Sequence, residues 1–375
     1  MPRICAILTG AASAASLLSV ATARAAPRTD LLQVPPGFHV SVVSDHVPNA
    51  REMVRGARGT IFVGSMGAGS VYALTGVDGG GPVQVRTIAR GLSLPVGVAY
   101  HDGDLYVSDM RRIVVLRDIE DHLDTPPKPE VVADNLPYRP GDHSWKFIAF
   151  GPDNRLYVPI GAPCNICDVG HEFGRIISMN ANGTDRRDVA YGIRNSVGIT
   201  WQPGTGVMWF TDNGRDNMGD DMPSDELNRV DVPGQSFGYP YCHQGNIADP
   251  QFGSRHPCSE FTPPALLLGA HVAALGLRFY EGTEFPAPYH GSLMIAEHGS
   301  WNRSQLSGYQ VVSVGFAADN RPQPPTVLVG GFRQGQRAWG RPADVLPLPD
   351  GSMLISDDLS GAIYRLTYGD AVPTH

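Results

Sequence analysis

The chain has 375 residues, of which 42% are hydrophobic, and it carries a formal net charge of −8 at neutral pH. This length and apolar content suffice to bury one large core or two ordinary ones. The 44 glycines and 32 prolines indicate many turns and argue against long helices, so we expect an all-β fold. The acidic surface argues against a nucleic-acid partner.

The N-terminal segment resembles a secretory signal peptide. Arg3 precedes a stretch of small and apolar residues from Ile4 to Val20, and the alanines at positions 23 and 25 then fit a cleavage site. The stretch is short and rich in serine and alanine, unlike a membrane anchor, and no second run approaches membrane length. We therefore expect a signal peptide at 1–25, a periplasmic or secreted protein, and no membrane span.

A unit made of an apolar run, a turn and a β-rich run occurs six times along the rest of the chain. Its second run ends in small or acidic residues, as in DLYVSD (104–109) and VMWFTD (207–212). Repeats of roughly 40 to 50 residues with several short strands are typical of β-propeller blades. The sequence therefore predicts an all-β, six-bladed β-propeller as a single domain over 26–375. The turns of the six units are anchored by Gly59, Gly103, Asn154, Gly206, Gly291 and Gly351.

Two segments depart from the simple repeat. The interval between the fourth and fifth turn anchors is the longest, which predicts an insertion around 232–265. Residues 36–43 alternate apolar and polar residues like a lone strand, and could complete the last blade. Two sandwiches of three units each are the alternative architecture, although no linker-like stretch divides the chain near its middle.

Four cysteines follow the N-terminal segment, and an even number in an exported chain suggests disulfides. We expect a disulfide between Cys242 and Cys258, which would bracket a loop rich in proline and glycine. Cys164 and Cys167 form a CxxC motif, but Asp168 stands where haem attachment needs a histidine, and a thioredoxin-like context is absent. We expect a local structural disulfide between Cys164 and Cys167.

Polar residues recur where the first strand of each predicted blade begins. In a propeller these strands line the central channel, so residues at their starts converge at one mouth. A ring of polar residues there predicts a binding site, because the starts of buried strands are usually apolar or glycine. Counting back about ten residues from each turn anchor, with more for the longer fifth turn, gives Arg51, Pro95, Asp142, His143, Arg194, Asn195, His271 and Arg341.

The chemistry of this ring favours an anionic ligand. Arginine offers a charged planar fork to carboxylates or phosphates, and histidine can take a proton near neutral pH. No P-loop or dinucleotide motif is present, which favours a carboxylate-rich cofactor over a nucleotide. Structural interpretations remain open: Asp142 and His143 could cap a turn, and Arg194 could pair with nearby acids. The acidic loop 212–226 could bind Ca²⁺ or be a solvated surface, and its spacing matches no EF-hand.

The sequence resembles the soluble pyrroloquinoline quinone (PQQ)-dependent sugar dehydrogenases, and more closely their L-sorbosone dehydrogenase-like or aldose sugar dehydrogenase branch. The resemblance covers about residues 36–368 and implies a six-bladed propeller, in agreement with the repeat count. It also implies that PQQ, a tricarboxylate, is held with Ca²⁺ at the mouth of the channel. The most specific motifs are GDHSWKFIAFGPD (141–153), YGIRN (191–195), the stretch 211–228, EHGSWNR (297–303) and WGRPADV (339–345).

The resemblance implies roles for single residues. His143 matches the catalytic base, which takes the proton of the anomeric hydroxyl while hydride passes to the quinone, and Asp142 could orient its imidazole. Arg194 matches the residue that stabilises charge on the reduced cofactor. Asn195 and Arg341 match further cofactor-binding residues.

The resemblance also implies calcium ligands and one further contact. The active-site calcium would be held by the backbone carbonyls of Gly214 and Arg215, while Asp225 and Glu226 match acids of a further calcium site. Arg303 stands where better-understood members have a lysine and is a substitute for it in binding the cofactor. Arg215 replaces a proline.

The expected function is that of a PQQ- and calcium-dependent periplasmic dehydrogenase that oxidises an aldose or sugar aldehyde to a lactone or acid. Because the chain has no CxxCH haem motif, the electrons would pass to a separate acceptor, a cytochrome or a quinone. A calcium-dependent propeller lactonase is one alternative, but it has no evident need for both Arg194 and Arg341. A non-enzymatic, protein-binding propeller is the other, since runs such as 207–212 also resemble receptor-type repeats.

Overall fold

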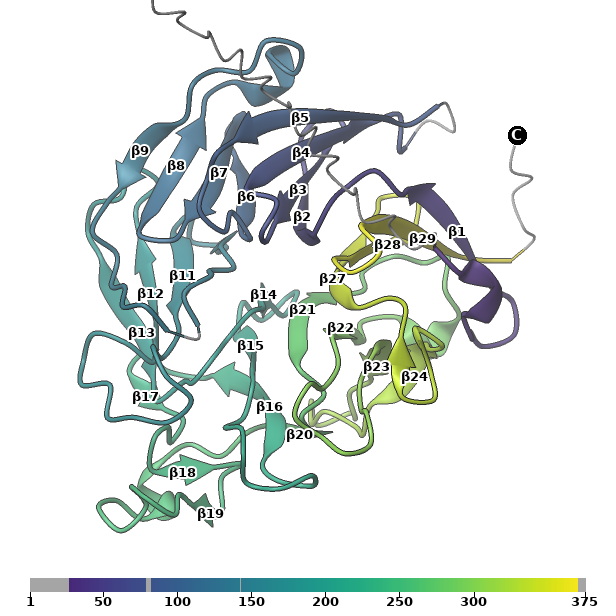
Figure 1. Cartoon of the computed structure of the whole chain (residues 1–375). Coiled ribbons are helices and arrows are strands. Elements are labelled where there is room, and N and C mark those ends of the chain that lie inside the picture. Colours follow the sequence, from purple (N-terminus) through teal and green to yellow (C-terminus); the bar gives the residue numbers. More distant parts are fainter. Residues whose placement is uncertain (1–26, 79–81, 142, 370–375) are drawn as a thin grey trace, which may run out of the picture.

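The computed structural model describes residues 27–78, 82–141 and 143–369, so the expected signal peptide and Asp142 lie outside the described residues. Six sheets of antiparallel strands surround a central axis like the blades of a propeller (Figure 1). This arrangement confirms the predicted six-bladed β-propeller. The helical elements of the described residues are four short 3₁₀ turns: η1 (Thr29–Leu31), η2 (Ile119–Asp121), η3 (Cys258–Glu260) and η4 (Ala287–Tyr289).

In each of the first three blades the chain runs outward from a short inner strand. Blade one contains β2 (Ala50–Arg55), β3 (Ile61–Ser65), β4 (Ser70–Thr75) and β5 (Gln84–Arg90). Blade two contains β6 (Val98–His101), β7 (Asp104–Asp109), β8 (Arg112–Leu116) and β9 (Glu130–Ala133). Blade three contains β10 (Ala149–Phe150), β11 (Leu156–Ile160), β12 (Arg175–Met179) and β13 (Arg187–Tyr191), extended in parallel by β17 (Gln235–Ser236).

The last three blades repeat this order, except that the outer strand of blade six comes from the N-terminal part of the chain. Blade four contains β14 (Ile199–Trp201), β15 (Met208–Asp212), β16 (Ser224–Val230) and β20 (Leu266–Ala270). Blade five contains β21 (Ala274–Phe279), β22 (Leu293–Glu297), β23 (Gln310–Val314) and β24 (Thr326–Val329). Blade six contains β27 (Pro342–Pro347), β28 (Met353–Asp357), β29 (Ala362–Tyr368) and β1 (Phe38–Ser44).

Strand β1 closes the ring, as the alternating pattern of 36–43 predicted. It pairs antiparallel with β29, with Phe38 opposite Tyr368 and Val40 opposite Leu366. The first described strand therefore completes the last blade, and residues from both ends of the described chain share one sheet.

The six turn anchors all have positive φ angles, for example 87° at Gly59 and 59° at Asn154. Glycine and asparagine tolerate this left-handed region better than other residues. The repeated turn chemistry thus has a local steric cause, which is why it marks the blades in the sequence.

The hydrophobic core lies between neighbouring blades. One cluster joins blades one and two through Phe62 and Val107, and another joins blades six and one through Ile363 and Ile61. Four further clusters join the remaining neighbours in the same way. Each blade therefore buries both faces, and burial of this kind is the dominant stabilising term in folding.

The segment 232–265 holds β17, the hairpin of β18 (Cys242–His243) and β19 (Ile247–Ala248), and η3. A disulfide joins Cys242 to Cys258, and a second joins Cys164 to Cys167, so both predicted pairings are confirmed. A further hairpin, β25 (Arg333–Gln334) and β26 (Arg337–Ala338), precedes blade six. Within the described ranges, none of the helices is long and apolar enough to cross a membrane.

Candidate active site

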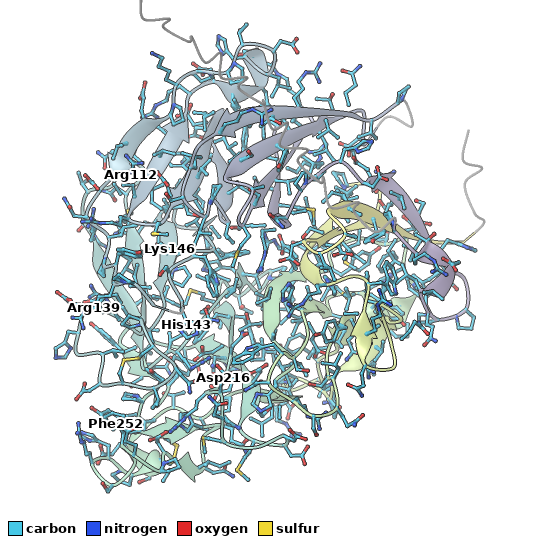
Figure 2. All side chains as sticks on the ribbon, in the orientation of Figure 1. Arg112, Arg139, His143, Lys146, Asp216 and Phe252 are labelled. Carbon is cyan, nitrogen blue, oxygen red and sulfur yellow. A yellow bond between two sulfur atoms is a disulfide. The ribbon has the colours of Figure 1, made fainter. Side chains whose placement is uncertain are left out.

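A cavity of about 460 Å³ is lined by residues at or just before the inner strands of several blades. Six of the eight residues that the sequence predicts at the mouth of the channel line this cavity. Of the other two, Pro95 is not among the lining residues, and Asp142 lies outside the described residues. Figure 2 shows where His143 and Asp216 lie among the side chains of the ring. The converging residues that line the cavity are Arg51, His143, Arg194, Asn195, His271 and Arg341.

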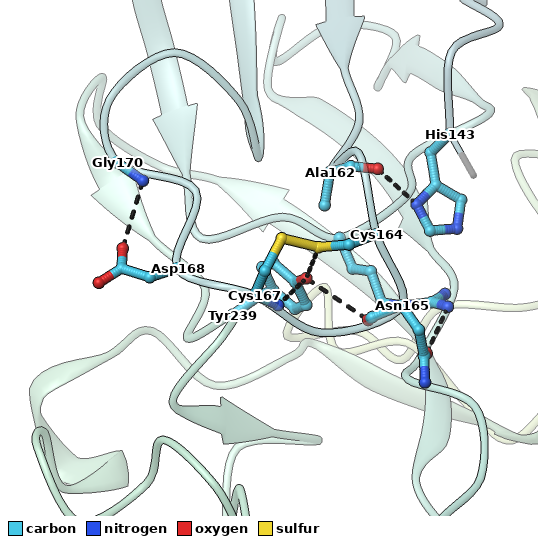
Figure 3. Close-up of a disulfide and its surroundings, with 9 residues drawn as sticks. His143, Ala162, Cys164, Asn165, Cys167, Asp168, Gly170 and Tyr239 are labelled. Atoms are coloured by element: carbon cyan, nitrogen blue, oxygen red, sulfur yellow. Dashed lines mark hydrogen bonds between the residues drawn. A yellow bond between two sulfur atoms is a disulfide. The ribbon is translucent and has the colours of Figure 1, made fainter. Parts of the chain in front are cut away.

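His143 is buried and has a defined tautomer. Its Nδ1 donates a hydrogen bond to the carbonyl of Ala162 at 2.7 Å (Figure 3), so Nε2 of the neutral ring is left as an acceptor. Burial, and then the positive charge of Arg194, lower the pKa of His143 to about 3. His143 is therefore a neutral imidazole near pH 7 with a lone pair available for a proton.

Arg194 is 4% exposed and is held on several sides. Its guanidinium donates to the side-chain oxygen of Asn165 at 2.9 Å, to the carboxylate of Asp216 at 2.7 Å, and to the backbone carbonyls of Asn165 at 2.9 Å and Asn213 at 3.2 Å. These bonds use four of the five N–H groups that an arginine carries. One N–H of Nη1 remains for a ligand.

The backbone around Arg194 and Asn195 is fixed by a buried acid at the end of β15. The carboxylate of Asp212 accepts from the backbone N–H of Arg194 at 3.0 Å and from that of Asn195 at 2.6 Å. Burial raises the pKa of Asp212. Burial and the charge of Asp212 raise the pKa of the neighbouring Glu226. Asp212 thus anchors the YGIRN motif from behind the cavity.

Two more guanidinium groups reach the cavity near the end of β28. Arg341 donates to the carbonyls of His298 at 3.1 Å and Gly299 at 2.7 Å, and Arg51 pairs with Asp358 at 2.7 Å. The Nε of Arg51 is buried without a hydrogen-bond partner among the described residues. A buried donor without a partner is energetically costly.

His298 shares the carboxylate of Asp358 with Arg51. Its Nε2 donates to Asp358 at 2.8 Å, while burial lowers the pKa of His298 to about 4. Burial would raise the pKa of Asp358, but His298 and Arg51 hold it well below its usual range. Asp358 therefore remains ionised and fixes both cavity-lining partners.

The residues assigned to calcium lie in and behind one wall of the cavity. Asp225 accepts from the backbone N–H of Gly214 at 2.7 Å and from that of Ala273 at 2.6 Å, and burial raises its pKa to about 6. Glu226 accepts from the N–H of Gln244 at 2.8 Å and from Asn228 at 3.0 Å. The side chain of Arg215 pairs with Asp249 in the inserted segment.

Backbone carbonyl oxygens are the groups of this wall that could bind a cation. Within the described chain, no group of three or more His, Cys, Asp or Glu residues is arranged to hold a metal ion. The carbonyl oxygens of Gly214 and Arg215 accept no hydrogen bond from the described residues, and Gly214 lines the cavity. Oxygen ligands of this type suit Ca²⁺.

Arg303 is held outside the group of lining residues. It donates to the carbonyl of Asp220 at 2.8 Å and to the carboxylate of Asp221 at 2.7 Å. The side chain of Arg303 therefore lies against the acidic loop, beside the cavity wall formed by Trp301 and Asn302. The structure does not bring it together with Arg194 and Arg341.

Several lining residues were missed from the sequence. Asn165 lies inside the CxxC motif, which had been interpreted only as a disulfide, and Asp216 lies in the acidic loop. His298 and Trp301 stand in the EHGSWNR motif, in which the resemblance assigns a role only to Arg303. Trp301 is 71% exposed at the cavity, a position from which an indole ring can contact a ligand.

The comparisons with known proteins agree with this architecture. The TrAA12-like family model matches residues 32–368. An uncharacterized protein of Borreliella burgdorferi is 34% identical over 366 residues, which are 94% of this chain and 95% of that protein. A pyrroloquinoline quinone-dependent pyranose dehydrogenase of Coprinopsis cinerea is 26% identical over 234 residues, which are 48% of this chain and 31% of that protein.

Solved structures share the fold. The calcium structure of a carbohydrate-active enzyme of family AA12 from Trichoderma reesei superposes with a TM-score of 0.78 and 22% identity, covering 93% of this chain and 100% of that chain. The resemblance drawn from the sequence motifs is confirmed by these matches. Because the family model spans nearly the whole described propeller, the chain belongs to the TrAA12-like family.

Proposed function

We propose that this protein is a PQQ- and calcium-dependent dehydrogenase that oxidises an aldose or a sugar aldehyde to a lactone or an acid. The observation that carries the proposal is one cavity in which a neutral, buried His143 with a free Nε2 stands beside Arg51, Arg194 and Arg341. Membership of the TrAA12-like family and the match to a PQQ-dependent pyranose dehydrogenase support it.

The cavity suits a small polyanionic cofactor. Its volume of about 460 Å³ lies in the range of small-molecule sites. Arg341, Arg51 and the remaining N–H of Arg194 would bind carboxylate or quinone oxygens, with Asn195 beside them. Arg303 would contact the cofactor only after leaving its partners Asp220 and Asp221.

When bound, PQQ supplies the acceptor for the hydride that leaves the sugar carbon. The role proposed for His143 is to take the hydroxyl proton of the substrate at Nε2. The bond from Nδ1 to Ala162 keeps that lone pair on Nε2. Asp142 is proposed to help orient the ring, together with the Ala162 carbonyl. Arg194 is proposed to stabilise the negative charge of the reduced cofactor.

The proposed calcium ligands are the carbonyls of Gly214 and Arg215. Asp225 fixes the backbone at Gly214, and the ion pair to Asp249 turns the Arg215 side chain toward the inserted segment. The assignment of Asp225 and Glu226 to a further calcium site rests on the resemblance alone, because their oxygens already accept hydrogen bonds from the protein.

The electrons would leave the protein to a separate acceptor, a cytochrome or a quinone, because the sequence has no haem-attachment motif. The proposed location is the periplasm or the exterior, as the segment 1–25 indicates.

The test is dye reduction by purified apo-protein with a panel of aldoses, with and without PQQ and Ca²⁺. We expect activity only when both are added, and a loss of about 10²- to 10⁴-fold in His143→Ala, the usual contribution of a general base. The variant should still bind PQQ, which separates loss of the base from loss of the site. Failure of the wild-type protein to bind PQQ would refute the proposal, and lactone hydrolysis would then be assayed.

A further inference from the structure

Asn165 is the residue most heavily engaged with Arg194. Its side-chain oxygen accepts from Nη2 of Arg194 at 2.9 Å and from the backbone N–H of Asp216 at 2.8 Å (Figure 3 shows Asn165 and its loop). Its Nδ2 donates to the backbone carbonyl of Asp216 at 3.0 Å, and its own carbonyl accepts from Nε of Arg194 at 2.9 Å. Asn165 thus makes two hydrogen bonds with the side chain of Arg194 and two with the backbone of Asp216 in the acidic loop.

Asp216 extends this contact across the cavity wall. One of its oxygens accepts from Arg194 at 2.7 Å and the other accepts from Nδ2 of Asn302 at 3.0 Å. All four residues line the same cavity. The side chain of Asn165 therefore fixes, through Arg194 and Asp216, parts of the wall that come from three separate loops.

The disulfide encloses Asn165. Cys164 and Cys167 close a loop of four residues, and the backbone N–H of Cys167 donates to the hydroxyl of Tyr239 at 3.1 Å. The same hydroxyl donates to the carbonyl of Asn165 at 3.4 Å, and Tyr239 is buried. The loop is thus tied covalently at its ends and by Tyr239 from beneath, which restricts the conformations open to Asn165.

We infer that Asn165 is a positioning residue for Arg194, and that the Cys164–Cys167 disulfide serves the cofactor site by holding Asn165 in place. This inference rests on the proposed function. An arginine has a long side chain with several rotatable bonds, and ordering it during binding weakens affinity. Asn165 orders the Arg194 side chain before the ligand binds. The four hydrogen bonds of the guanidinium then fix the direction of the remaining N–H of Nη1.

The experiment measures the affinity of the apo-protein for PQQ in the presence of Ca²⁺, by quenching of tryptophan fluorescence. We expect Asn165→Ala to weaken binding about 10- to 100-fold, the usual effect of removing a group that orients a ligand-binding residue. Asn165→Asp keeps the acceptor for Arg194 and should retain more affinity than Asn165→Ala. Asn182→Ala, in an exposed turn of the same blade, is the matched control and should leave the affinity unchanged.

A double-mutant cycle separates positioning from a general structural effect. In an Arg194→Lys background, which keeps the charge but lacks the fork that Asn165 holds, Asn165→Ala should change PQQ affinity by less than about threefold. Equal losses in both backgrounds would overturn the inference, and so would equal affinities of Asn165→Asp and Asn165→Ala.

The disulfide is tested by the double variant Cys164→Ser with Cys167→Ser. It should weaken PQQ binding in the same direction as Asn165→Ala, while Cys242→Ser with Cys258→Ser should change affinity by less than about threefold despite a lower unfolding temperature. Unchanged affinity without Cys164 and Cys167 would overturn the role given to the disulfide. If the wild-type protein binds no PQQ, the proposed function fails; if it binds and Asn165→Ala binds equally well, only this inference fails.

Discussion

At the scale of single residues, burial controls the protonation of the site. His143 and His298 are both buried, and desolvation lowers the pKa of His143 to about 3 and that of His298 to about 4. Neutral histidines suit a cavity that already holds three guanidinium groups. A bound polyanion would favour the protonated form of His143, because a nearby opposite charge raises the pKa of an imidazole.

The lowered pKa of His143 predicts a pH-dependent contribution to stability. In the unfolded chain this histidine binds a proton below about pH 6.5, whereas in the folded protein it does so only near pH 3. The unfolded state therefore gains protons as the pH falls from 6.5 toward 3, and the folded state loses stability over that range. Relative to His143→Gln, the wild-type free energy of unfolding should fall by about 2 kcal/mol between pH 7 and pH 5.

Urea unfolding of both proteins at the two pH values measures this difference, and the comparison cancels the contributions of other titrating groups. A constant difference between wild type and variant would show that His143 is protonated alike in the folded and unfolded states.

At the scale of elements, one aromatic side chain of β1 packs into the core where the ring closes. Phe38 is 4% exposed and packs edge-on against Phe285, with ring centroids 4.9 Å apart, and against Tyr368 at 5.0 Å. It thereby joins the outer strand of blade six to the core shared with blade five. The adjacent His39 is exposed on the other face of the same strand.

Phe38→Ala should lower the free energy of unfolding by about 3 to 5 kcal/mol, because it leaves a cavity in the core. His39→Ala should change it by less than about 0.5 kcal/mol, as is usual for exposed positions. Urea unfolding followed by circular dichroism measures both. A similar small effect of the two substitutions would show that β1 is not needed to close the ring.

At the scale of the whole molecule, the site joins loops from blades that are distant in the sequence. Arg51 lies at the start of β2 in blade one, Arg194 precedes β14 of blade four, and Arg341 directly precedes β27 of blade six. A ligand that contacts all three binds only the closed ring, so its binding free energy adds to the stability of the folded state.

PQQ with Ca²⁺ should therefore raise the unfolding temperature. At a ligand concentration about 100 times the dissociation constant, linkage gives about 2.7 kcal/mol of added stability. Calorimetry with both ligands, with each alone, and with EDTA measures the shift, and Arg341→Ala should reduce it. An unchanged unfolding temperature with both ligands at saturation would contradict the proposed cofactor site.

The sequence alone determined the blade architecture and the residues that begin the blades. Both follow from short-range effects: a turn that needs positive φ at Gly59 or Asn154 marks each repeat, and a nearly constant distance from that turn gives the residues at the start of each blade. Because the repeat places equivalent positions at one mouth, the sequence predicts that Arg51, His143 and Arg194 converge there. The even number of cysteines and the segments that they enclose likewise predict the two disulfides.

Only the tertiary structure decided what these residues contact. The loops between strands have no repeat, so nothing in the sequence placed Asn165 against Arg194, or His298 against Asp358. Arg303 had several acids within reach, and the path of the acidic loop placed Asp220 and Asp221 beside it. Such pairings depend on which loops face each other across the cavity, and folding of the whole ring brings those loops together.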